Sequence, residues 1–533
     1  MEKTRLGFMV DCSRNAVVSV SGAKRLIDAL GKMGYNMLML YTEDTYLVDG
    51  YEHFGYMRGA YTKDELREME QYAKTRGIEL VPCIQTLAHL NQIFRWKEFR
   101  EFRDCDDILL AEDEGTYALI DAMLGSLRES FSGDIIHIGM DEAHNIGRGR
   151  YKDIHGECDR FGVLSRHLCR VCELCKKHGF SPIMWSDMFF RLANRGAYYL
   201  TDPSVITQRV IDSATEDVGL VYWDYYRDKK EQYDTMIEAH KRFGKDVWFA
   251  GGAWTWTGFA PHNKVSISRT AEAMKACREG GVDNIFFTSW GDDGSETSYM
   301  SVLPTLFWAA EIYRQNTDEA LIKERFFELF GVPFDDFMKL DLPCAVDERY
   351  ENSTANSDKV LFYNDPFMGL FDTEIEKHAD ISEKYESYAR KLSSVGIGTE
   401  YEYLFKCSSA LCSFLAVKST LGKRIRAEYE KKDKDELSRL VSEIEEAISR
   451  LDAFYALYRK AWLGERKGSG FEIQDIRIGG LRMRLFDCKM RIEEYISGEI
   501  DTIDDLNQPT STVYNSLSET QWANITTANK VKF

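Results

Sequence analysis

Two adjacent carboxylates, Asp141 and Glu142, follow the short apolar run Ile135–Met140. Neighbouring side chains of an extended strand point to opposite faces, so these two address one ligand only where the chain leaves strand geometry. Paired carboxyl groups hydrolyse glycosides, but an ordinary retaining enzyme needs them about 5–5.5 Å apart, flanking the scissile bond. Asp141 and Glu142 approach from one side. Unless another carboxylate serves, the nucleophile must therefore come from the substrate.

Aromatic residues gather with acidic ones after four later apolar runs. Five of the ten tryptophans lie there, in the segments Trp185-Ser-Asp187, Trp223-Asp224-Tyr225-Tyr226, Trp254-Thr-Trp256 and Trp290-Gly-Asp292-Asp293. Tryptophan usually fills a core, which is the alternative interpretation. A pocket with apolar walls and a few polar points instead suits a sugar, whose C–H faces stack on aromatic rings while its hydroxyls need carboxylate or arginine partners. We favour the pocket.

The elements that must position these residues are eight short apolar runs, each followed by a helix-like amphipathic stretch. The runs are Leu6–Val10, Met37–Tyr41, Leu80–Ile84, Ile135–Met140, Pro182–Trp185, Leu220–Trp223, Val247–Ala250 and Ile285–Thr288. Eight βα units close a (β/α)8 TIM barrel, an α/β fold whose site lies at the carboxyl ends of the strands. The rival, an open doubly wound sheet, is weakened because Asp11-Cys-Ser-Arg14 stands where that fold has a glycine-rich turn.

The chain changes character after the predicted barrel. We expect residues 1–310 to form the catalytic barrel and residues 311–533 to form a mostly α-helical domain, with helices over Glu374–Leu392, Glu400–Glu430 and Glu436–Tyr458. The charged run between the last two indicates a solvated helix connection. The structure of the tail after Ser511 is left open.

The first three hundred residues resemble the catalytic barrel of family 20 glycoside hydrolases, the β-N-acetylhexosaminidases. The resemblance rests on segments that occur in the family's order: Asp11-Cys-Ser-Arg14, Thr86-Leu-Ala-His89, His137-Ile-Gly-Met-Asp141-Glu142, Met184-Trp185, Trp223 and Trp290-Gly-Asp292. Trp185–Phe190 and Val221–Tyr226 resemble in particular a bacterial branch that acts on terminal GlcNAc and GalNAc and carries a helical C-terminal region.

The resemblance implies a retaining, substrate-assisted mechanism. Glu142 would be the general acid and then the base, while Asp141 would hold the N–H of the substrate's 2-acetamido group. The acetamido oxygen would attack C1 and form an oxazolinium ion, which water then opens. Tyr225 would donate a hydrogen bond to that oxygen.

The same resemblance implies the substrate-binding residues. Ring hydroxyls would meet Arg14, Glu43 or Asp44, and Asp292; the acetamide pocket would have tryptophan walls; and His89 would orient the acid. The predicted aromatic residues are Trp185, Trp223 and Trp290 in the walls, with Trp254 and Trp256 at the same rim.

Two features depart from the family's pattern. The first barrel strand begins within ten residues of Met1, where the family usually has a small α/β domain, so this chain either lacks that domain or is truncated. The last strand is followed by Trp290-Gly-Asp292 where Trp-Gly-Glu is common, and the next glutamate is Glu296.

Composition limits the classes of partner. The 533 residues are 44 % hydrophobic, and 68 Lys and Arg against 87 Asp and Glu give a net charge of −19, which argues against nucleic acid. No uninterrupted apolar run has the length of a membrane span, and twelve thinly spread cysteines fit free thiols in the cytoplasm. We expect a glycan or amino-sugar oligosaccharide substrate, no cofactor, no nucleic acid or membrane partner, and a homodimer as one option.

Two rival functions stay open at this point. Cys169, Cys172, Cys175 and His178 have a spacing that suits an iron–sulfur or zinc site. On one helix, however, positions three apart drift around the axis, so the thiols would not converge on one ion. A catalytically silent sugar-binding barrel is disfavoured because both Asp141 and Glu142 are present.

Overall fold

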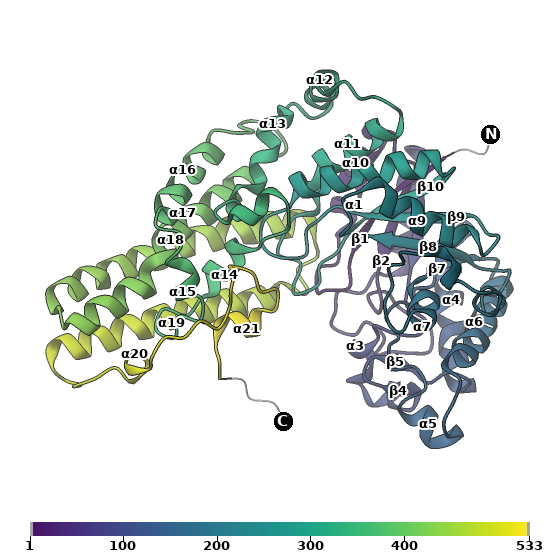
Figure 1. Ribbon diagram of the computed structural model, residues 1–533, viewed down its shortest axis with the longest axis horizontal. Helices are drawn as coiled ribbons and strands as arrows, with labels where there is room; N and C mark the ends of the chain where they lie inside the picture. The colour runs from purple at the N-terminus through teal and green to yellow at the C-terminus, as the bar shows by residue number, and fades with distance from the viewer. Residues whose placement is uncertain (1–3, 530–533) are drawn as a thin grey trace. The chain divides into compact units, whose positions relative to one another are not determined.

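The computed structural model describes residues 4–529 (Figure 1). The chain divides into two compact units, each formed by several segments. The first takes the chain up to Ala253 together with Ser266–Ser289 and Thr305–Thr317, and the second takes Trp254–Val265, Trp290–Pro304 and the chain from Asp318. The segments of the two units alternate along the sequence. A single boundary between residues 310 and 311 was expected, and it stays a prediction.

The first unit is a closed parallel barrel in the order β1-β10-β9-β8-β7-β6-β3-β2. Its strands are β1 (Arg5–Asp11), β2 (Met37–Tyr41), β3 (Glu79–Cys83), β6 (Ile135–His137), β7 (Ser181–Trp185), β8 (Gly219–Asp224), β9 (Val247–Gly252) and β10 (Asn284–Ser289). All eight predicted runs become strands, and the predicted fold class is confirmed. β6 ends three residues earlier than expected because Gly139 and Met140 adopt left-handed φ angles of 72° and 70°.

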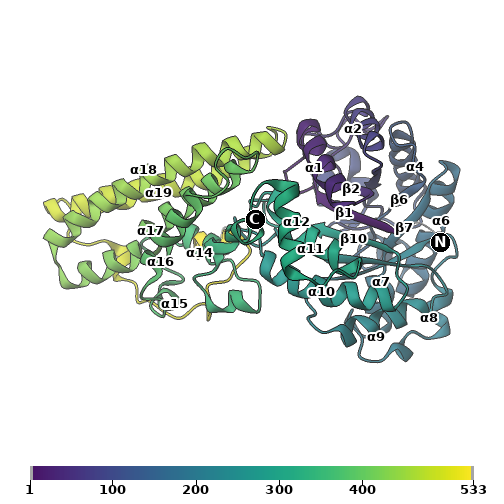
Figure 2. The same ribbon diagram turned by 90° about the horizontal axis from the view of Figure 1, so that it is seen from above.

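Helices lie outside the strands, as Figure 2 shows for α1, α2, α4 and α6. The helices up to residue 313 are α1 (Val20–Met33), α2 (Lys63–Thr75), α3 (Asn91–Phe94), α4 (Glu114–Arg128), α5 (Arg150–His155), α6 (Arg160–Lys177), α7 (Asp187–Ala193), α8 (Gln208–Asp212), α9 (Lys230–Lys241), α10 (Asn263–Glu279) and α11 (Leu303–Tyr313). Local signals start them: Ser19, Thr62 and Asp113 cap α1, α2 and α4 with side-chain oxygens. Thr62 and Glu65 form a complete capping box.

A small antiparallel hairpin, β4 (Arg103–Cys105) with β5 (Ile108–Leu109), lies between β3 and α4. No pattern in the sequence predicts this hairpin. Asp104 of this hairpin is buried and accepts hydrogen bonds from the backbone N–H groups of Gly147 (3.0 Å) and Tyr151 (2.7 Å). The hairpin therefore holds the loop that follows Glu142.

The second unit is helical beyond Asp318, as expected. Its helices are α12 (Glu319–Phe330), α13 (Phe334–Phe337), α14 (Ser357–Tyr363), α15 (Asp372–Ile375), α16 (Ile381–Ser393), α17 (Glu402–Lys431), α18 (Lys434–Glu465), α19 (Phe471–Ser497), α20 (Asp504–Asn507) and α21 (Trp522–Thr526). The predicted helix Glu374–Leu392 is interrupted between α15 and α16. The predicted connection between α17 and α18 is a tight turn, with Lys432 at φ 59° and Asp433 capping α18.

Helix α17 is long and apolar enough, by length and composition alone, to cross a membrane. Core helices pass the same test, and 56 % of its most apolar window is buried. Because α17 packs against α16 and α18, contacts within the helical unit account for its composition.

Replacing Gly149 by alanine should destabilise the first unit. A Cβ at this position would stand 2.7 Å from Cys105 Cβ and closer still to the Asp104 carbonyl oxygen, so the backbone of the hairpin must move. We expect Gly149→Ala to lower the free energy of unfolding by about 1–3 kcal/mol in urea titrations.

Gly31→Ala is the matched control. Gly31 lies inside α1, and the nearest atom to its added Cβ is 3.9 Å away. We expect that variant to gain roughly 0.5–1 kcal/mol, because glycine disfavours helix interiors. Equal behaviour of the two variants contradicts the role assigned to the hairpin contact.

Candidate active site

Asp141 and Glu142 leave strand geometry together. Met140 has a φ of 70° and Glu142 a φ of 52°, both in the left-handed region. As a result the two carboxylates face the same imidazole: His89 Nε2 lies 3.2 Å from Asp141 Oδ2 and 3.8 Å from Glu142 Oε2. The structure therefore meets the condition under which neighbouring residues can serve one ligand.

His89 is held in place by Asp107 of the loop between β4 and β5. The backbone N–H of His89 donates to Asp107 Oδ2 at 2.9 Å, and His89 Nδ1 lies 3.9 Å from the same oxygen. Burial lowers the pKa of His89, but the charge of Asp141 outweighs it and raises that pKa from 6.5 to about 10. Near neutral pH the ring is therefore an imidazolium.

Asp141 is ionised although it lies in a largely buried position. Burial alone would raise the pKa of its carboxyl group, but the His89 imidazolium and a hydrogen bond from Gln85 lower that pKa below its usual value. Gln85 Nε2 donates to Asp141 Oδ1 at 2.7 Å and to Tyr41 Oη at 2.9 Å, and Gln85 Oε1 accepts from Met140 N at 3.0 Å. Asp141 is thus a fixed hydrogen-bond acceptor.

Arg14 and Glu43 form an ion pair from the ends of β1 and β2. Arg14 Nη1 lies 2.7 Å from Glu43 Oε1, which also accepts from Tyr41 Oη at 2.9 Å. The Arg14 side chain is 28 % exposed, whereas that of Glu43 is 1 % exposed. Tyr41 and Gln85 thus connect this pair to Asp141 through hydrogen bonds.

The structure places Asp44 in a different environment. Its carboxylate forms a buried ion pair with Arg58 at 2.8 Å, and Arg58 also donates to Asn15 Oδ1 at 2.7 Å. Burial raises the pKa of Asp44 to about 6, although Arg58 opposes that rise. Of the two alternatives Glu43 and Asp44, Glu43 is the one beside Arg14.

The aromatic residues of the first unit form two groups. Trp185 is 1 % exposed and its ring centroid lies 4.4 Å from that of His137, the residue that ends β6. Trp223 stacks on Tyr225 with centroids 5.3 Å apart and lies 4.7 Å from Tyr198. Trp223 and Tyr225 are therefore in direct contact, and the pocket they were expected to line stays a prediction.

Four predicted residues belong to the second unit. Trp254 and Trp256 are both buried and stack with ring centroids 3.9 Å apart. Trp290 directly follows β10, and its carbonyl oxygen accepts from Thr255 Oγ1 at 2.8 Å. Asp292 is exposed. Within this unit, the segments after β9 and β10 are thus joined to each other.

Two further acidic residues, Asp224 and Asp187, support loops. Asp224 accepts from the backbone N–H groups of Tyr226 and Arg227, both at 3.1 Å, and so caps the loop after β8. Asp187 accepts from the backbone N–H of Glu142 at 3.2 Å and from Arg191 Nε at 2.9 Å. Arg191 was not predicted as a site residue. The one feature of the sequence that points to it is its position one helical turn after Asp187.

The three cysteines of the run lie on a helix, as expected. On α6, Cys172 and Cys175 are buried while Cys169 is exposed. Among residues 4–529 no group of three His, Cys, Asp or Glu side chains is arranged to hold a metal ion. The metal hypothesis therefore has no geometric support in that range.

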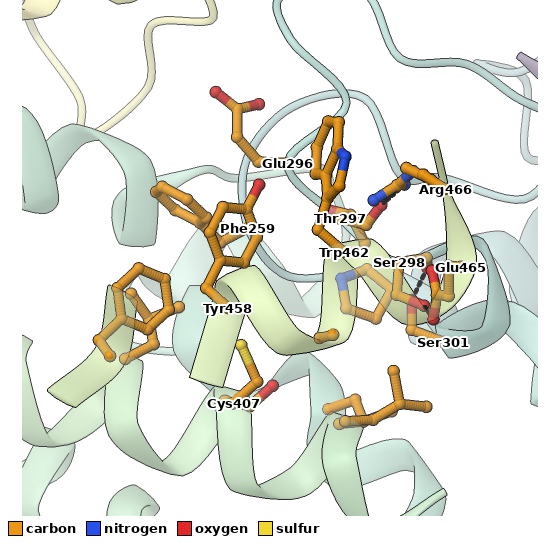
Figure 3. A pocket seen from close by; sticks show the side chains of 17 residues that line it. Phe259, Glu296, Thr297, Ser298, Ser301, Cys407, Tyr458, Trp462, Glu465 and Arg466 are labelled. Carbon is orange, nitrogen blue, oxygen red and sulfur yellow. Dashed lines mark hydrogen bonds between the residues drawn. The ribbon is translucent and has the colours of Figure 1, made fainter. Parts of the chain in front are cut away.

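A cavity in the second unit is lined in part by Phe259, Tyr458 and Trp462 (Figure 3). Its volume is about 40 Å³, far below the roughly 300–1,000 Å³ of small-molecule pockets. It has space for water and not for a sugar ring.

Two family models match this chain. The model of the glycosyl hydrolase family 20 catalytic domain matches residues 5–238, and that of the Glycoside Hydrolase 20C C-terminal domain matches residues 335–525. The chain belongs to glycoside hydrolase family 20. The resemblance to family 20 that the sequence motifs indicated is confirmed.

Several known proteins are similar to this family 20 chain. Human Hexosaminidase D is 24 % identical over 299 residues, covering 52 % of this chain and 58 % of that protein. A β-hexosaminidase of Akkermansia muciniphila is 27 % identical over 236 residues, covering 36 % and 45 %. The structure of a GH20 exo β-N-acetylglucosaminidase from Vibrio harveyi has a TM-score of 0.48 at 16 % identity, covering 64 % and 59 %. The chain thus spans little more than half the length of these relatives, or less.

The imidazolium of His89 should make stability depend on pH. Because its pKa is raised from 6.5 to about 10 in the folded protein, the stabilisation is complete below pH 6.5 and is lost as pH rises through 10. We expect the wild type to lose more free energy of unfolding between pH 7 and pH 10 than His89→Gln does, measured by urea titration. His53→Gln, at an exposed histidine, is the control. Parallel pH curves for the wild type and His89→Gln contradict the ion pair.

Proposed function

We propose that this protein is an exo-acting β-N-acetylhexosaminidase, which removes terminal β-linked GlcNAc, GalNAc or both by a retaining, substrate-assisted mechanism. The observation that carries the proposal is the placement of Asp141 and Glu142 on one side of one imidazolium, 3.2 Å and 3.8 Å from His89 Nε2. Family membership supports the reaction class.

Glu142 is the proposed general acid and then the base. Its side chain is 45 % exposed, so it can reach a leaving group, while Asp141 is 14 % exposed and ionised beside His89. Asp141 accepts the acetamido N–H and favours the developing positive charge on that group. The acetamido oxygen attacks C1, the C1–O bond breaks, and the leaving-group oxygen takes the proton of Glu142. Water then adds at C1 as Glu142 removes its proton, and the bond between C1 and the acetamido oxygen breaks, which restores the acetamido group.

The neighbouring carboxylates support a nucleophile supplied by the substrate. Glu43 is paired with Arg14, Asp44 with Arg58, and Asp187 with Arg191. All three carboxylates are buried. A covalent glycosyl-enzyme needs a carboxylate that reaches C1, and these three are engaged elsewhere.

The remaining contacts with the sugar follow from the resemblance. Arg14 binds ring hydroxyls, Trp185 and Trp223 line the acetamide pocket, and Tyr225 donates to the acetamido oxygen. The roles proposed for Trp254, Trp256, Trp290 and Asp292 stay predictions, as do the bacterial origin and the homodimer. A cytoplasmic location is also proposed, and the twelve free thiols support it.

Substrate choice tests the mechanism. We expect the protein to hydrolyse aryl β-GlcNAc or aryl β-GalNAc and to leave the matching β-glucoside at the background rate, since the glucoside lacks the internal nucleophile. Initial rates on the three glycosides measure this. Comparable turnover of the glucoside contradicts substrate assistance, and binding of GlcNAc without any hydrolysis favours the silent sugar-binding alternative.

Asp141→Asn should lower kcat far more than it raises KM. The amide fills the same space but loses the charge that stabilises the closing oxazolinium ring, and removing one such preorganised contact costs about 10²–10³-fold. A thiazoline analogue of the closed ring should also bind more weakly. If Asp141→Asn keeps kcat and thiazoline binding near the wild-type values, Asp141 is not the residue that holds the acetamido group, and another carboxylate must take that role.

A further inference from the structure

The two carboxylate oxygens of Glu142 face two different cations. Glu142 Oε2 lies 3.8 Å from His89 Nε2, and Glu142 Oε1 lies 3.6 Å from Arg191 Nη2. His89 comes from the loop after β3, whereas Arg191 comes from α7, after β7. The carboxylate is therefore bracketed by positive charges from two separate elements.

Arg191 is held rigidly for a residue near an open site. Its Nε donates to Asp187 Oδ2 at 2.9 Å, and Asp187 is fully buried. The guanidinium carbon lies 5.9 Å from the centroid of the Trp223 ring and 5.8 Å from that of Tyr198, within cation–π range. The Arg191 side chain is only 18 % exposed. Its position is thus set by an ion pair and by aromatic packing.

A single oxygen joins this arginine to the backbone of the proposed acid. Asp187 Oδ2, which binds Arg191 Nε, also accepts the backbone N–H of Glu142 at 3.2 Å. Asp187 therefore binds the backbone of Glu142 directly. It also holds Arg191, whose guanidinium lies beside the Glu142 side chain. Moving α7 relative to the loop after β6 would disturb both contacts at once.

We infer that Arg191 is a positioning residue for Glu142, which it orients towards the leaving group and stabilises as an anion after proton donation. The inference rests on the proposed function and deepens it. When the proton of Glu142 passes to the leaving-group oxygen, a negative charge remains on Glu142 until water is deprotonated. Arg191 faces the oxygen that His89 does not, so the two cations share that charge.

Other charged groups around Glu142 bear on its protonation. His89 and Arg191 are the facing cations, Asp141 is the neighbouring anion, and His144 lies in the same loop. Asp187 also lies beside Glu142, and burial together with the charge of Asp141 raises its pKa to about 7. Removing Arg191 leaves Asp141 and Asp187 less compensated. Loss of the proton from Glu142 then becomes less favourable, which moves the pH dependence upward.

The test compares Arg191→Met with Arg195→Met on aryl β-GlcNAc and aryl β-GalNAc across pH. Arg195 is exposed and lies four residues further along the chain, beyond the end of α7, so its variant removes the same charge without the contact. For Arg191→Met we expect the alkaline limb of kcat/KM to move up by about half to one pH unit. We also expect kcat near the optimum to fall by about tenfold, a part of the roughly 10²–10⁴-fold that general acid–base help contributes. Arg195→Met should match the wild type in both.

Two further variants separate charge from folding. Arg191→Gln is neutral and retains a hydrogen-bond donor for Asp187, so it should shift the alkaline limb of kcat/KM as Arg191→Met does. If Arg191→Met fails to fold, Arg191→Gln takes its place in the test. Arg191→Lys retains the cation and should keep the wild-type limb while kcat falls less. An unshifted limb in both folded neutral variants overturns the inference. A wild type inactive on both substrates overturns the proposed function, and this inference with it.

Discussion

The left-handed turn at the end of β6 is the constraint on which the site depends. Gly139 has a φ of 72°, and a Cβ there would stand 2.8 Å from the Ile84 carbonyl and overlap the Gln85 side chain. Met140 and Glu142 are also left-handed, at a cost of roughly 1–2 kcal/mol each for non-glycine residues. Gln85 and Asp187 offset that cost by accepting the N–H groups of Met140 and Glu142. Without this turn, Asp141 and Glu142 would point to opposite faces.

Charge alternation explains how acidic groups persist in such a small volume. A buried carboxylate is costly unless it is paired and hydrogen-bonded, and removing one partner leaves an uncompensated charge. Around His89 acidic and basic side chains alternate, from Asp141 through His89, Glu142 and Arg191 to Asp187. Burial and the charge of Asp141 raise the pKa of Asp187 to about 7, although Arg191 opposes that rise. Each cation separates two carboxylates, so the groups stabilise one another as a set. The same order keeps Asp141 ionised for the acetamido N–H while the more exposed Glu142 remains accessible.

The sequence predicted the barrel well because its strands carry buried, continuous apolar runs that periodicity detects. The β4–β5 hairpin escaped because strands of three and two residues are too short for any period. Gln85 escaped because a neutral amide carries no catalytic signal, although it follows β3 by only two residues. The burial of Asp44 depends on its ion pair with Arg58. Local sequence patterns do not predict the path of the loop that brings Arg58 back to Asp44. Patterns thus located the strand ends, and tertiary pairing decided which carboxylates stay accessible.

The segment after β10 shows how pairing also decides between two acidic residues. Glu296 is buried, with its Oε1 3.0 Å from Lys359 Nζ of α14 and 2.8 Å from Arg477 Nη1 of α19. Lys359 is fully buried and also binds Asp293 at 3.0 Å, so the segment is fixed by charges of the helical unit to which it belongs. A carboxylate held by two cations in a closed cluster has little left to offer a hydroxyl group. Glu296 therefore does not replace the glutamate that the family commonly has after its last strand. Asp292, next but one to Trp290, is exposed, and its role as a hydroxyl acceptor stays a prediction.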